Sequence, residues 1–255
     1  MHIIIIKRRL IKKYLIGLAI VVLVIMAILI IGKNVRNTFM FEKKAIPIYS
    51  VETKDKKIAI TFDTSWGVDN TKPILDVLKK EDVKATFFLI GKWVEAYPED
   101  ARLIAAMGHE IGNHSDSHQE FTKLSKEQIL REINSADAKI MGVTGIKTSL
   151  FRFPEGTYNS NSVKVVEATN HKCIQWDADS IDWKNEGYQI EYNRVIKNIK
   201  NGSIILFHNS GKYTPQTVDM LIKKLKSQGY SFMKVSDLIY KENYDLDESG
   251  RQIIK

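Results

Sequence analysis

The sequence predicts an α/β fold with a mainly parallel sheet, preceded by one transmembrane helix. After Val51, short runs of β-branched and aromatic residues alternate with amphipathic helical stretches, which is typical of successive βα units. Polar residues follow several of the strand candidates, and parallel α/β proteins place their functional sites at strand ends. Six or seven strands are predicted, and their order alone does not distinguish a closed barrel from an open sheet.

The first predicted element is a membrane anchor at Tyr14–Gly32, which is nineteen residues long and carries no charge. A helix of that length spans about 28 Å, close to the hydrocarbon core of a bilayer. Five cations lie shortly before it, whereas Lys33 and Arg36 follow, so we expect an extracytoplasmic C-terminal domain on a single-pass anchor in the cell membrane. The alternative is a cleaved signal peptide, although its apolar region would be about 7–15 residues long, and residues 34–39 lack a small-residue cleavage site.

The charge pattern agrees with this organisation. The net charge of +8 is carried by residues 1–44, with nine cations and one acid, and the remaining chain is balanced at 29 of each. A nucleic-acid-binding domain would itself carry the basic excess, so no nucleic-acid partner is expected. The sequence has neither a G-x-x-x-x-G-K-[ST] nor a G-x-G-x-x-G motif, so a nucleotide site has no support, and its single cysteine, Cys173, excludes an internal disulfide. The expected segments are a cytoplasmic basic tail (1–13), the anchor (14–32), a tether (33–52), a domain (53–242) and a frayed polar tail (243–255).

The first half of the domain alternates apolar strand candidates with amphipathic helix candidates. In chain order, these are the strand Lys57–Phe62, the helix Asn70–Glu81, the strand Ala85–Ile90, the helix Glu99–Met107, the short strand His109–Gly112 and the helix Ser125–Met141. Apolar residues recur along the last helix from Ile129 to Ile140 at three- and four-residue spacings. Ser125 and Gln128 at its start predict a capping box.

The second half continues the same alternation. In chain order, its candidates are the strand Leu150–Phe153, the helix Ser160–Thr169, the strand Lys172–Trp176, the helix Ile190–Ile199, the strand Ser203–Phe207, the helix Thr214–Ser227, the strand Tyr230–Val235 and a short helix at Asp237–Tyr240. The run at Ser203–Phe207 is almost wholly apolar, which indicates a strand buried on both faces.

Two of the strand ends carry residues suited to acid–base or metal chemistry. Asp63 follows the first strand and precedes a Trp-Gly turn, although aspartate is also an ordinary turn residue. His114 and His118 lie four residues apart after the third strand, a spacing that lets both imidazoles reach one metal ion.

Three later strand ends are also polar. Arg152 closely precedes a Pro-x-Gly turn and could point from the strand end into a site, although most arginines are ordinary surface residues. Residues 176–183 hold three aspartates and two tryptophans, and tryptophan faces suit the apolar faces of sugar rings. His208 ends an apolar strand and is an acid or base candidate, because the pKa of histidine is easily shifted.

Taken together and in this order, the five clusters resemble the polysaccharide deacetylase family, also called carbohydrate esterase family four or the NodB-homology domain. The family motifs are T-F-D-D-G, H-[ST]-x-x-H, R-x-P-x-G, D-x-x-D-W and L-x-H. The corresponding segments here are Thr61–Ser65 in altered form, His114–His118, Arg152–Gly156, Asp179–Trp183 and Leu206–His208. The resemblance implies a distorted (β/α) barrel of about seven parallel strands and a hydrolase that removes acetyl groups from glycans.

The resemblance also implies a role for each matching residue. Asp63 corresponds to the base that activates water, Arg152 to the residue that holds this base, His208 to the general acid and Asp182 to the aspartate that tunes it. His114 and His118 correspond to metal ligands, with zinc the expected metal. The implied substrate-binding residues are Trp66, Phe153, Pro154, Gly156, Trp183 and Leu206.

One departure from the family pattern leaves two function classes open. The second aspartate of T-F-D-D-G is a metal ligand in the family, and Thr64 stands in its place, which puts the metal in doubt. The chain is then either an active deacetylase of cell-wall glycan or a weak or inactive glycan-binding protein on the same fold. The altered motif and the short anchor resemble the sporulation-associated branch of the family, which implies peptidoglycan as substrate, and we expect a monomer.

Overall fold

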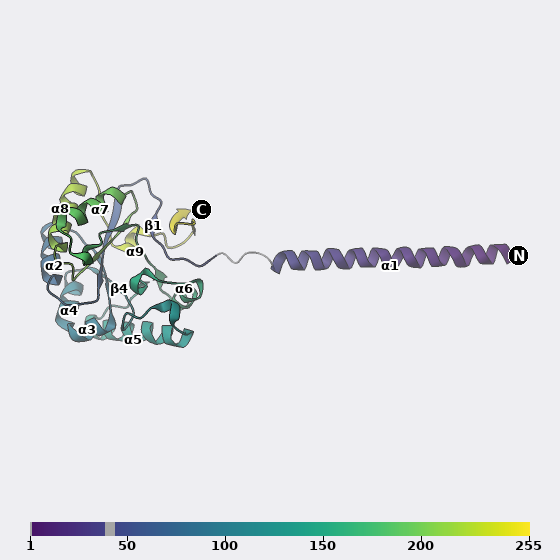
Figure 1. The fold of residues 1–255 in the computed structure, drawn as a ribbon, viewed down its shortest axis with the longest axis horizontal. Coiled ribbons are helices and arrows are strands. Elements are labelled where there is room, and N and C mark those ends of the chain that lie inside the picture. The colour runs from purple at the N-terminus through teal and green to yellow at the C-terminus, as the bar shows by residue number, and fades with distance from the viewer. Residues whose placement is uncertain (1, 39–43) are drawn as a thin grey trace. The chain divides into compact units, whose positions relative to one another are not determined.

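A computed structural model describes residues 2–38 and 44–255. The chain divides into two units, Met1–Lys44 and Ala45–Lys255, which are described separately (Figure 1). The first unit contains the helix α1 (His2–Thr38), in which Leu10–Leu29 is long and apolar enough to cross a membrane. None of that stretch is buried within the protein. The unit is therefore one N-terminal apolar helix, which suits a membrane anchor and equally a signal sequence.

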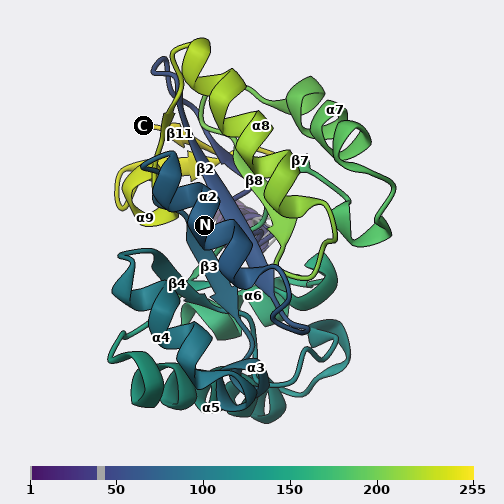
Figure 2. The same ribbon diagram turned by 90° about the vertical axis from the view of Figure 1, so that its left-hand side faces the viewer.

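The second unit is built on a parallel sheet that curls into a half-barrel, as the sequence predicted. Its seven strands lie in the order β6-β5-β4-β3-β2-β8-β7, and β9 pairs with the start of β2. The strands from β4 to β7 in this order are labelled in Figure 2. The strands are β2 (Lys57–Thr64), β3 (Thr86–Leu89), β4 (Glu110–Asn113), β5 (Leu150–Phe151), β6 (Lys172–Cys173), β7 (Ala178–Asp179), β8 (Ile204–His208) and β9 (Ser231–Phe232).

The register of the central strands positions the residues at their carboxyl ends. β2 pairs in parallel with both β3 and β8, and Asp63 lies opposite His208 across the β2–β8 pair. In parallel sheets the carboxyl ends of all strands lie at the same edge, so residues that follow β4 and β5 reach the same place. Polar groups that are up to 145 residues apart in sequence are therefore brought to one edge of the sheet.

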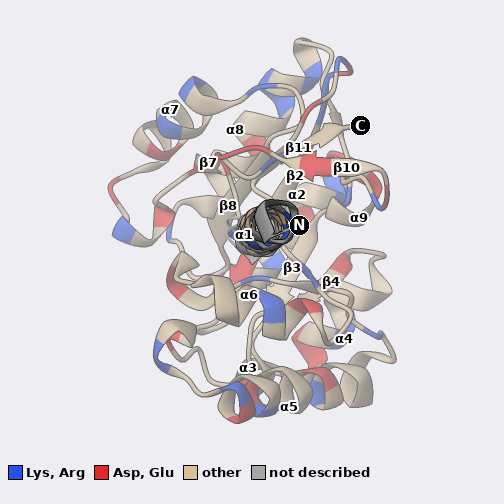
Figure 3. Cartoon of the chain, turned by 90° about the vertical axis from the view of Figure 1, so that its right-hand side faces the viewer, with Lys and Arg blue, Asp and Glu red and all other residues tan. Residues whose placement is uncertain are grey.

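Helices cover the sheet, and the apolar core lies between them. They are α2 (Thr71–Lys80), α3 (Gly91–Ala96), α4 (Pro98–Ala106), α5 (Lys126–Thr144), α6 (Ser160–Glu167), α7 (Tyr188–Asn198), α8 (Thr214–Ser227) and α9 (Val235–Leu238). Three short 3-10 turns are Phe121–Lys123, Pro154–Gly156 and Asp182–Lys184. The capping box predicted at the start of α5 is confirmed, since Ser125 and Gln128 bond reciprocally. Acidic and basic residues are interspersed over the unit, as its balanced charge requires (Figure 3).

Two expectations about the ends of the domain are corrected. The polar tail is not frayed, because β10 (Tyr244–Leu246) and β11 (Arg251–Ile254) form an antiparallel pair. The strand β1 (Ser50–Val51) adds to β11 in parallel, so residues expected in the tether belong to the compact unit. The side chain of Gln252 holds β11 in place, since it is buried and bonds to the backbone N–H and carbonyl oxygen of Tyr240. The helix α3 was also not predicted, because six residues are too few to show a periodic pattern.

Candidate active site

The carboxyl ends of the strands enclose a cavity of about 510 Å³. The residues that line it are Asp63, Ser65, Trp66, His114, His118, Glu155, Trp176, Asp179, Trp183, Leu206, His208 and Ser210. Several loops around the cavity hold non-glycine residues at positive φ, namely Ser115, His118, Glu155 and Ile181. Such backbone conformations cost free energy and persist where the surrounding structure holds them, most often at functional sites.

Asp63 lies at the end of β2 and is held by Arg152, which follows β5. The Arg152 Nη1 donates to Asp63 Oδ1 at 2.8 Å and to Thr61 Oγ1 at 2.8 Å. The Arg152 Nη2 donates to the carbonyl oxygen of Gln175 at 3.1 Å, and the guanidinium stacks over Phe88 with its carbon 4.1 Å from the ring centroid. Arg152 is fully buried and Asp63 nearly so. The ion pair is therefore shielded from water, and it fixes the orientation of the carboxylate.

The same contact decides the protonation state of Asp63. Burial alone would raise the pKa of Asp63, but the charge of Arg152 and then the nearby histidines bring this pKa below its ordinary value. The carboxylate is therefore ionised near neutral pH. Since Oδ1 is bonded to Arg152, the other oxygen, Oδ2, remains available to accept a proton.

His208 ends β8, and its environment favours the opposite protonation state. The His208 Nδ1–H donates to Asp182 Oδ1 at 2.7 Å, and its backbone N–H donates to Asp182 Oδ2 at 2.8 Å. The Thr214 hydroxyl also donates to Asp182 Oδ2, at 2.5 Å. Burial lowers the pKa of His208, but the hydrogen bond and charge of Asp182 outweigh it and raise this pKa above its ordinary value. The fully buried Asp182 thus keeps a proton available on a ring that lines the cavity.

Close packing fixes the Asp182 carboxylate further. A Cβ atom at Gly211 would lie 2.2 Å from Thr214 Oγ1 and 2.8 Å from Asp182 Oδ2. A real Cβ atom does not come this close to another heavy atom, so the close approach of the turn to the carboxylate requires glycine at this position. The turn and the start of α8 therefore act together to position Asp182.

His114 and His118 lie on the other side of Asp63. The His114 Nδ1 lies 2.8 Å from the carbonyl oxygen of Arg152, which can only accept, so Nδ1 carries the proton and Nε2 is left with a lone pair. Burial lowers the pKa of His114 to about 4, so the ring is neutral at neutral pH. Its Nε2 lies 3.5 Å from Asp63 Oδ2. Two acceptors at this distance need a shared donor or cation between them, and a water molecule can serve both.

The donor set does not fit a metal site with three strong protein ligands. Among residues 2–38 and 44–255, no group of three His, Cys, Asp or Glu side chains has the geometry to hold a metal ion. Thr64 is fully buried, its hydroxyl has no hydrogen-bond partner, and it does not line the cavity. His114 and His118 supply two neutral imidazoles, and the nearest carboxylate, Asp63, is already paired with Arg152. The family is generally metal-dependent, and this chain lacks the anionic ligand that such a site requires.

The structure brings most of the predicted site residues together, with three exceptions. Seven of them line the cavity, and Arg152 and Asp182 lie directly behind Asp63 and His208. Phe153, Pro154 and Gly156, expected at the substrate, do not line it. Phe153 is fully buried against Phe121 and Phe151, because its aromatic ring completes the core beside α5 and α6.

Other residues of the site lie in or beside the clusters that the sequence pointed to but were assigned no role of their own. Glu155, Trp176 and Asp179 line the cavity, as do the serines Ser65 and Ser210. Trp176 donates from Nε1 to Asp179 Oδ2 at 3.1 Å, which fixes both side chains. All five lie inside or next to the polar clusters at the strand ends, so proximity to those clusters was the available signal. No local sequence pattern indicated a role for Thr214, whose hydroxyl donates a hydrogen bond to Asp182.

Comparison with known proteins identifies the family. The family model for polysaccharide deacetylase matches residues 50–174. The peptidoglycan-N-acetylmuramic acid deacetylase PdaA of Bacillus subtilis is 32% identical over 202 residues, which cover 78% of this chain and 77% of PdaA. A peptidoglycan-N-acetylglucosamine deacetylase of Bacillus cereus is 36% identical over 197 residues, which cover 75% of this chain and 92% of the relative.

Solved structures give the same result and add a contrast. A family 4 carbohydrate esterase (CE4) pseudoenzyme from Bacillus anthracis superposes with a TM-score of 0.74 at 34% identity, covering 76% of this chain and 69% of that one. A mutant of it with restored enzymatic activity superposes with a TM-score of 0.74 at 35% identity, covering 76% and 71%. The fold and the relatives agree, and the chain belongs to the polysaccharide deacetylase family, a family of hydrolases.

Proposed function

We propose that this protein removes acetyl groups from N-acetylated cell-wall glycan, with peptidoglycan as the substrate. One observation carries the proposal: Asp63 and His208 lie opposite each other on paired strands, with the pKa of the first lowered and that of the second raised. Hydrolysis of an acetamide needs one group that accepts a proton from water and another that donates a proton to the departing nitrogen. A carboxylate and an imidazolium in this arrangement meet both needs.

The reaction begins with a water molecule beside Asp63 Oδ2 and His114 Nε2, the two acceptors that lie 3.5 Å apart. Asp63 takes one proton as the water oxygen attacks the carbonyl carbon of the acetamide. His208 then donates its Nε2 proton to the amide nitrogen, and the bond between this nitrogen and the carbonyl carbon breaks. The products are acetate and a free amine on the sugar. Arg152 and Asp182 act as positioning residues, which hold the base and the acid respectively.

Aromatic side chains at the rim suit the sugar ring. Trp66 and Trp183 are 63% and 56% exposed, yet both line the cavity. An exposed indole offers a flat apolar surface for the C–H face of a pyranose. Leu206 lies deeper, where it is 2% exposed, and provides an apolar contact for the acetyl methyl group.

The choice of peptidoglycan rests on the relatives and on the N-terminal helix. Relatives that are 32% and 36% identical are named as peptidoglycan deacetylases. A membrane anchor at Leu10–Leu29, with the basic residues before it in the cytoplasm, would hold the domain outside the membrane and next to the cell wall. We propose a role in spore formation on the resemblance of the altered T-F-D motif to the sporulation-associated branch.

A second function is favoured by a specific observation, the absence of a carboxylate at position 64. A structural relative at 34% identity is a pseudoenzyme, so this fold also occurs without catalysis. If turnover in this chain requires the missing ligand, the cavity and its exposed tryptophans remain able to bind glycan. The protein would then be a glycan-binding protein of the cell surface.

Acetate release from purified N-acetylated peptidoglycan separates these two functions. The full chain in detergent micelles is compared with Asp63→Asn, which keeps the shape of the side chain and removes the base. We expect acetate from the wild type and a loss of at least about 10²-fold in the variant, the scale typical of a positioned proton acceptor. Glycan binding without acetate release by the wild type would instead support the binding function.

A further inference from the structure

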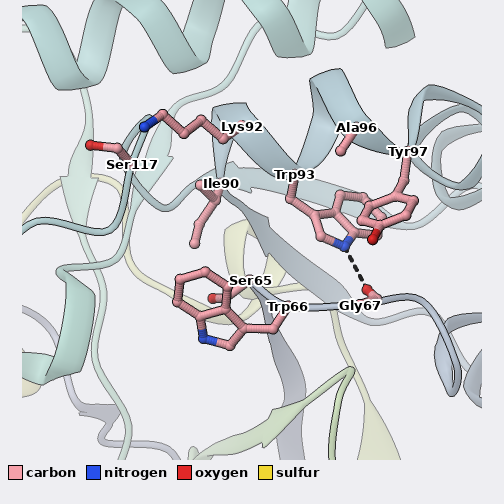
Figure 4. Close-up of a pocket in the computed structure, with 9 residues that line it drawn as sticks. All are labelled: Ser65, Trp66, Gly67, Ile90, Lys92, Trp93, Ala96, Tyr97 and Ser117. Carbon is pink, nitrogen blue, oxygen red and sulfur yellow. Dashed lines mark hydrogen bonds between the residues drawn. The ribbon is translucent and has the colours of Figure 1, made fainter.

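A second pocket, of about 220 Å³, lies beside the catalytic cavity. It is bordered by the turn that carries Trp66 and by the helix α3, which contributes Lys92 and Trp93 (Figure 4). Ser65 and Trp66 line both spaces, so the pocket and the cavity are adjacent. Its volume corresponds to about seven water molecules at about 30 Å³ each, enough for a substituent of a sugar but small for a disaccharide.

The shared wall of the two spaces is held in place. The carbonyl oxygen of Gly67 accepts from Trp93 Nε1 at 2.8 Å and from Asn209 Nδ2 at 2.9 Å. The Trp66 ring packs edge-on against His118, with their centroids 5.7 Å apart. On the side of the catalytic cavity, the Trp66 ring is held by His118. Its backbone is held through the hydrogen bonds to Gly67, the next residue in the turn. An indole that is exposed and yet fixed is suited to contact a ligand.

The two spaces differ in charge. Lys92 is the one charged residue among the described residues that line the second pocket, and its ammonium extends toward Ser117 (Figure 4). The acidic groups behind it are already engaged, since Asp116 pairs with Lys139 at 2.9 Å and Glu132 accepts from the backbone and hydroxyl of Ser117. The catalytic cavity instead has the carboxylates of Glu155 and Asp179 in its lining. An anionic group is therefore favoured in the second pocket and disfavoured in the cavity.

We propose that this pocket is a subsite for a carboxylate on the sugar next to the one that reacts, with Lys92 as its cationic partner and Trp66 as the shared wall. The proposal rests on the proposed function, because it concerns the glycan whose acetamide enters the cavity. The proposal assigns two neighbouring sugars of the glycan to the two spaces. A neutral acetamido sugar reacts in the catalytic cavity, and the acidic substituent of the next sugar lies in the second pocket. A lactyl ether, as in muramic acid, is a substituent of this chemistry.

The test compares the binding of two probes by the full chain in detergent micelles. One probe is a neutral tetrasaccharide of N-acetylglucosamine, and the other is a peptidoglycan tetrasaccharide with free muramic acid carboxylates. Lys92→Gln removes the cation and keeps most of the side chain. The control is Lys147→Gln, which removes the same charge from an exposed residue that precedes β5 and thus lies at the opposite edge of the parallel sheet.

We expect calorimetric titration to show a Kd for the acidic probe that rises about two- to fivefold in Lys92→Gln, the effect of an exposed ion pair, and more in Lys92→Glu. The Kd for the neutral probe should stay unchanged in both variants, and Lys147→Gln should change neither. Equal changes for the two probes, or no change for the acidic one, would overturn the subsite. Loss of charge selectivity is a binding result, so it is independent of acetate release. Selective binding without turnover supports the subsite while contradicting the proposed function.

Discussion

The two sides of the cavity differ in whether this chain supplies all the side chains that their proposed chemistry needs. On one side, each reactive group has a buried charge partner: Arg152 for Asp63, and Asp182 for His208. These contacts are 2.8 and 2.7 Å long and set opposite protonation states. The acid–base side therefore needs no further component to hold its geometry.

The other side, with His114 and His118, is incomplete as a metal site, because Thr64 stands where the family has an aspartate ligand and does not line the cavity. Its two imidazoles carry no negative charge, and the Thr64 hydroxyl is buried without a partner. In the proposed mechanism, the contrast separates the proton transfers, which Asp63 and His208 carry out, from metal binding, for which the two imidazoles lack an anionic partner. Substitutions of His208, Arg152 and Asp182 test the acid–base side, and a carboxylate introduced at position 64 tests the metal side.

The largest effect is expected from removing the acid. His208→Ala should lower kcat by about 10²–10⁴-fold, because no other group would donate a proton to the departing amine. The measurement is acetate release at saturating substrate, together with circular dichroism to confirm that the variant is folded. Unchanged turnover in a folded variant would remove His208 from the mechanism.

Breaking the buried ion pair should lower stability. Arg152→Met leaves the Asp63 carboxylate buried without its partner, and the free energy of unfolding should fall by about 3–5 kcal/mol. The matched control is the double variant Asp63→Asn with Arg152→Met, in which no charge is left unpaired. Urea unfolding should show that the double variant is more stable than the single one, and the opposite order would contradict a cost from the unpaired Asp63 carboxylate.

The pH profile should respond to Asp182. Activity requires ionised Asp63 and protonated His208, so the rate should fall at low pH as Asp63 gains a proton and at high pH as His208 loses one. Burial lowers the pKa of His208 and Asp182 raises it, so Asp182→Asn should lower this pKa. The fall in rate at high pH should then begin at lower pH, with a smaller loss of kcat than in His208→Ala. A profile whose alkaline side does not move would show that Asp182 does not tune His208.

The smallest effect concerns the stability of the metal side. Thr64→Asp buries a carboxyl group that has no partner and that takes up a proton rather than staying charged, so we expect the metal-free variant to be about 1–3 kcal/mol less stable than the wild type. Added zinc should recover this loss, because an ion that binds the folded state stabilises it. Thr64→Val is the control, since the hydroxyl it removes has no hydrogen-bond partner, and it should be close to neutral. Destabilisation of Thr64→Asp that zinc does not reverse would contradict a latent site at this position.

The fold was largely predictable because its signals are local. The alternation of apolar strands with amphipathic helices located six of the seven parallel strands, all except β7, and the capping box located the start of α5. The hairpin of β10 and β11 was not predicted, because its polar, charged sequence lacks a strand signal of its own, and its strands form through the pairing of β10 with β11 and of β11 with β1. Tertiary pairing of this kind leaves no periodic apolar pattern in the sequence.

For the site, the sequence located the clusters but not the direction of each side chain. Asp63, His114 and His208 follow strands whose ends meet, so their proximity could be predicted. Phe153 lies one residue after Arg152, and the two side chains point to different surroundings, one to the core and one to Asp63. That choice depends on the local backbone, which changes from strand to 3-10 turn at this point.

Zinc content, measured in parallel with acetate release, tests most directly whether the acid–base side acts without a tightly held metal. The wild-type chain and Thr64→Asp are titrated with zinc against a competing chelator and assayed on purified peptidoglycan. We expect substoichiometric, easily removed zinc in the wild type, acetate release that does not follow its zinc content, and tighter zinc in Thr64→Asp. Stoichiometric, chelator-resistant zinc in the wild type, with acetate release that is lost when the zinc is removed, would contradict the account.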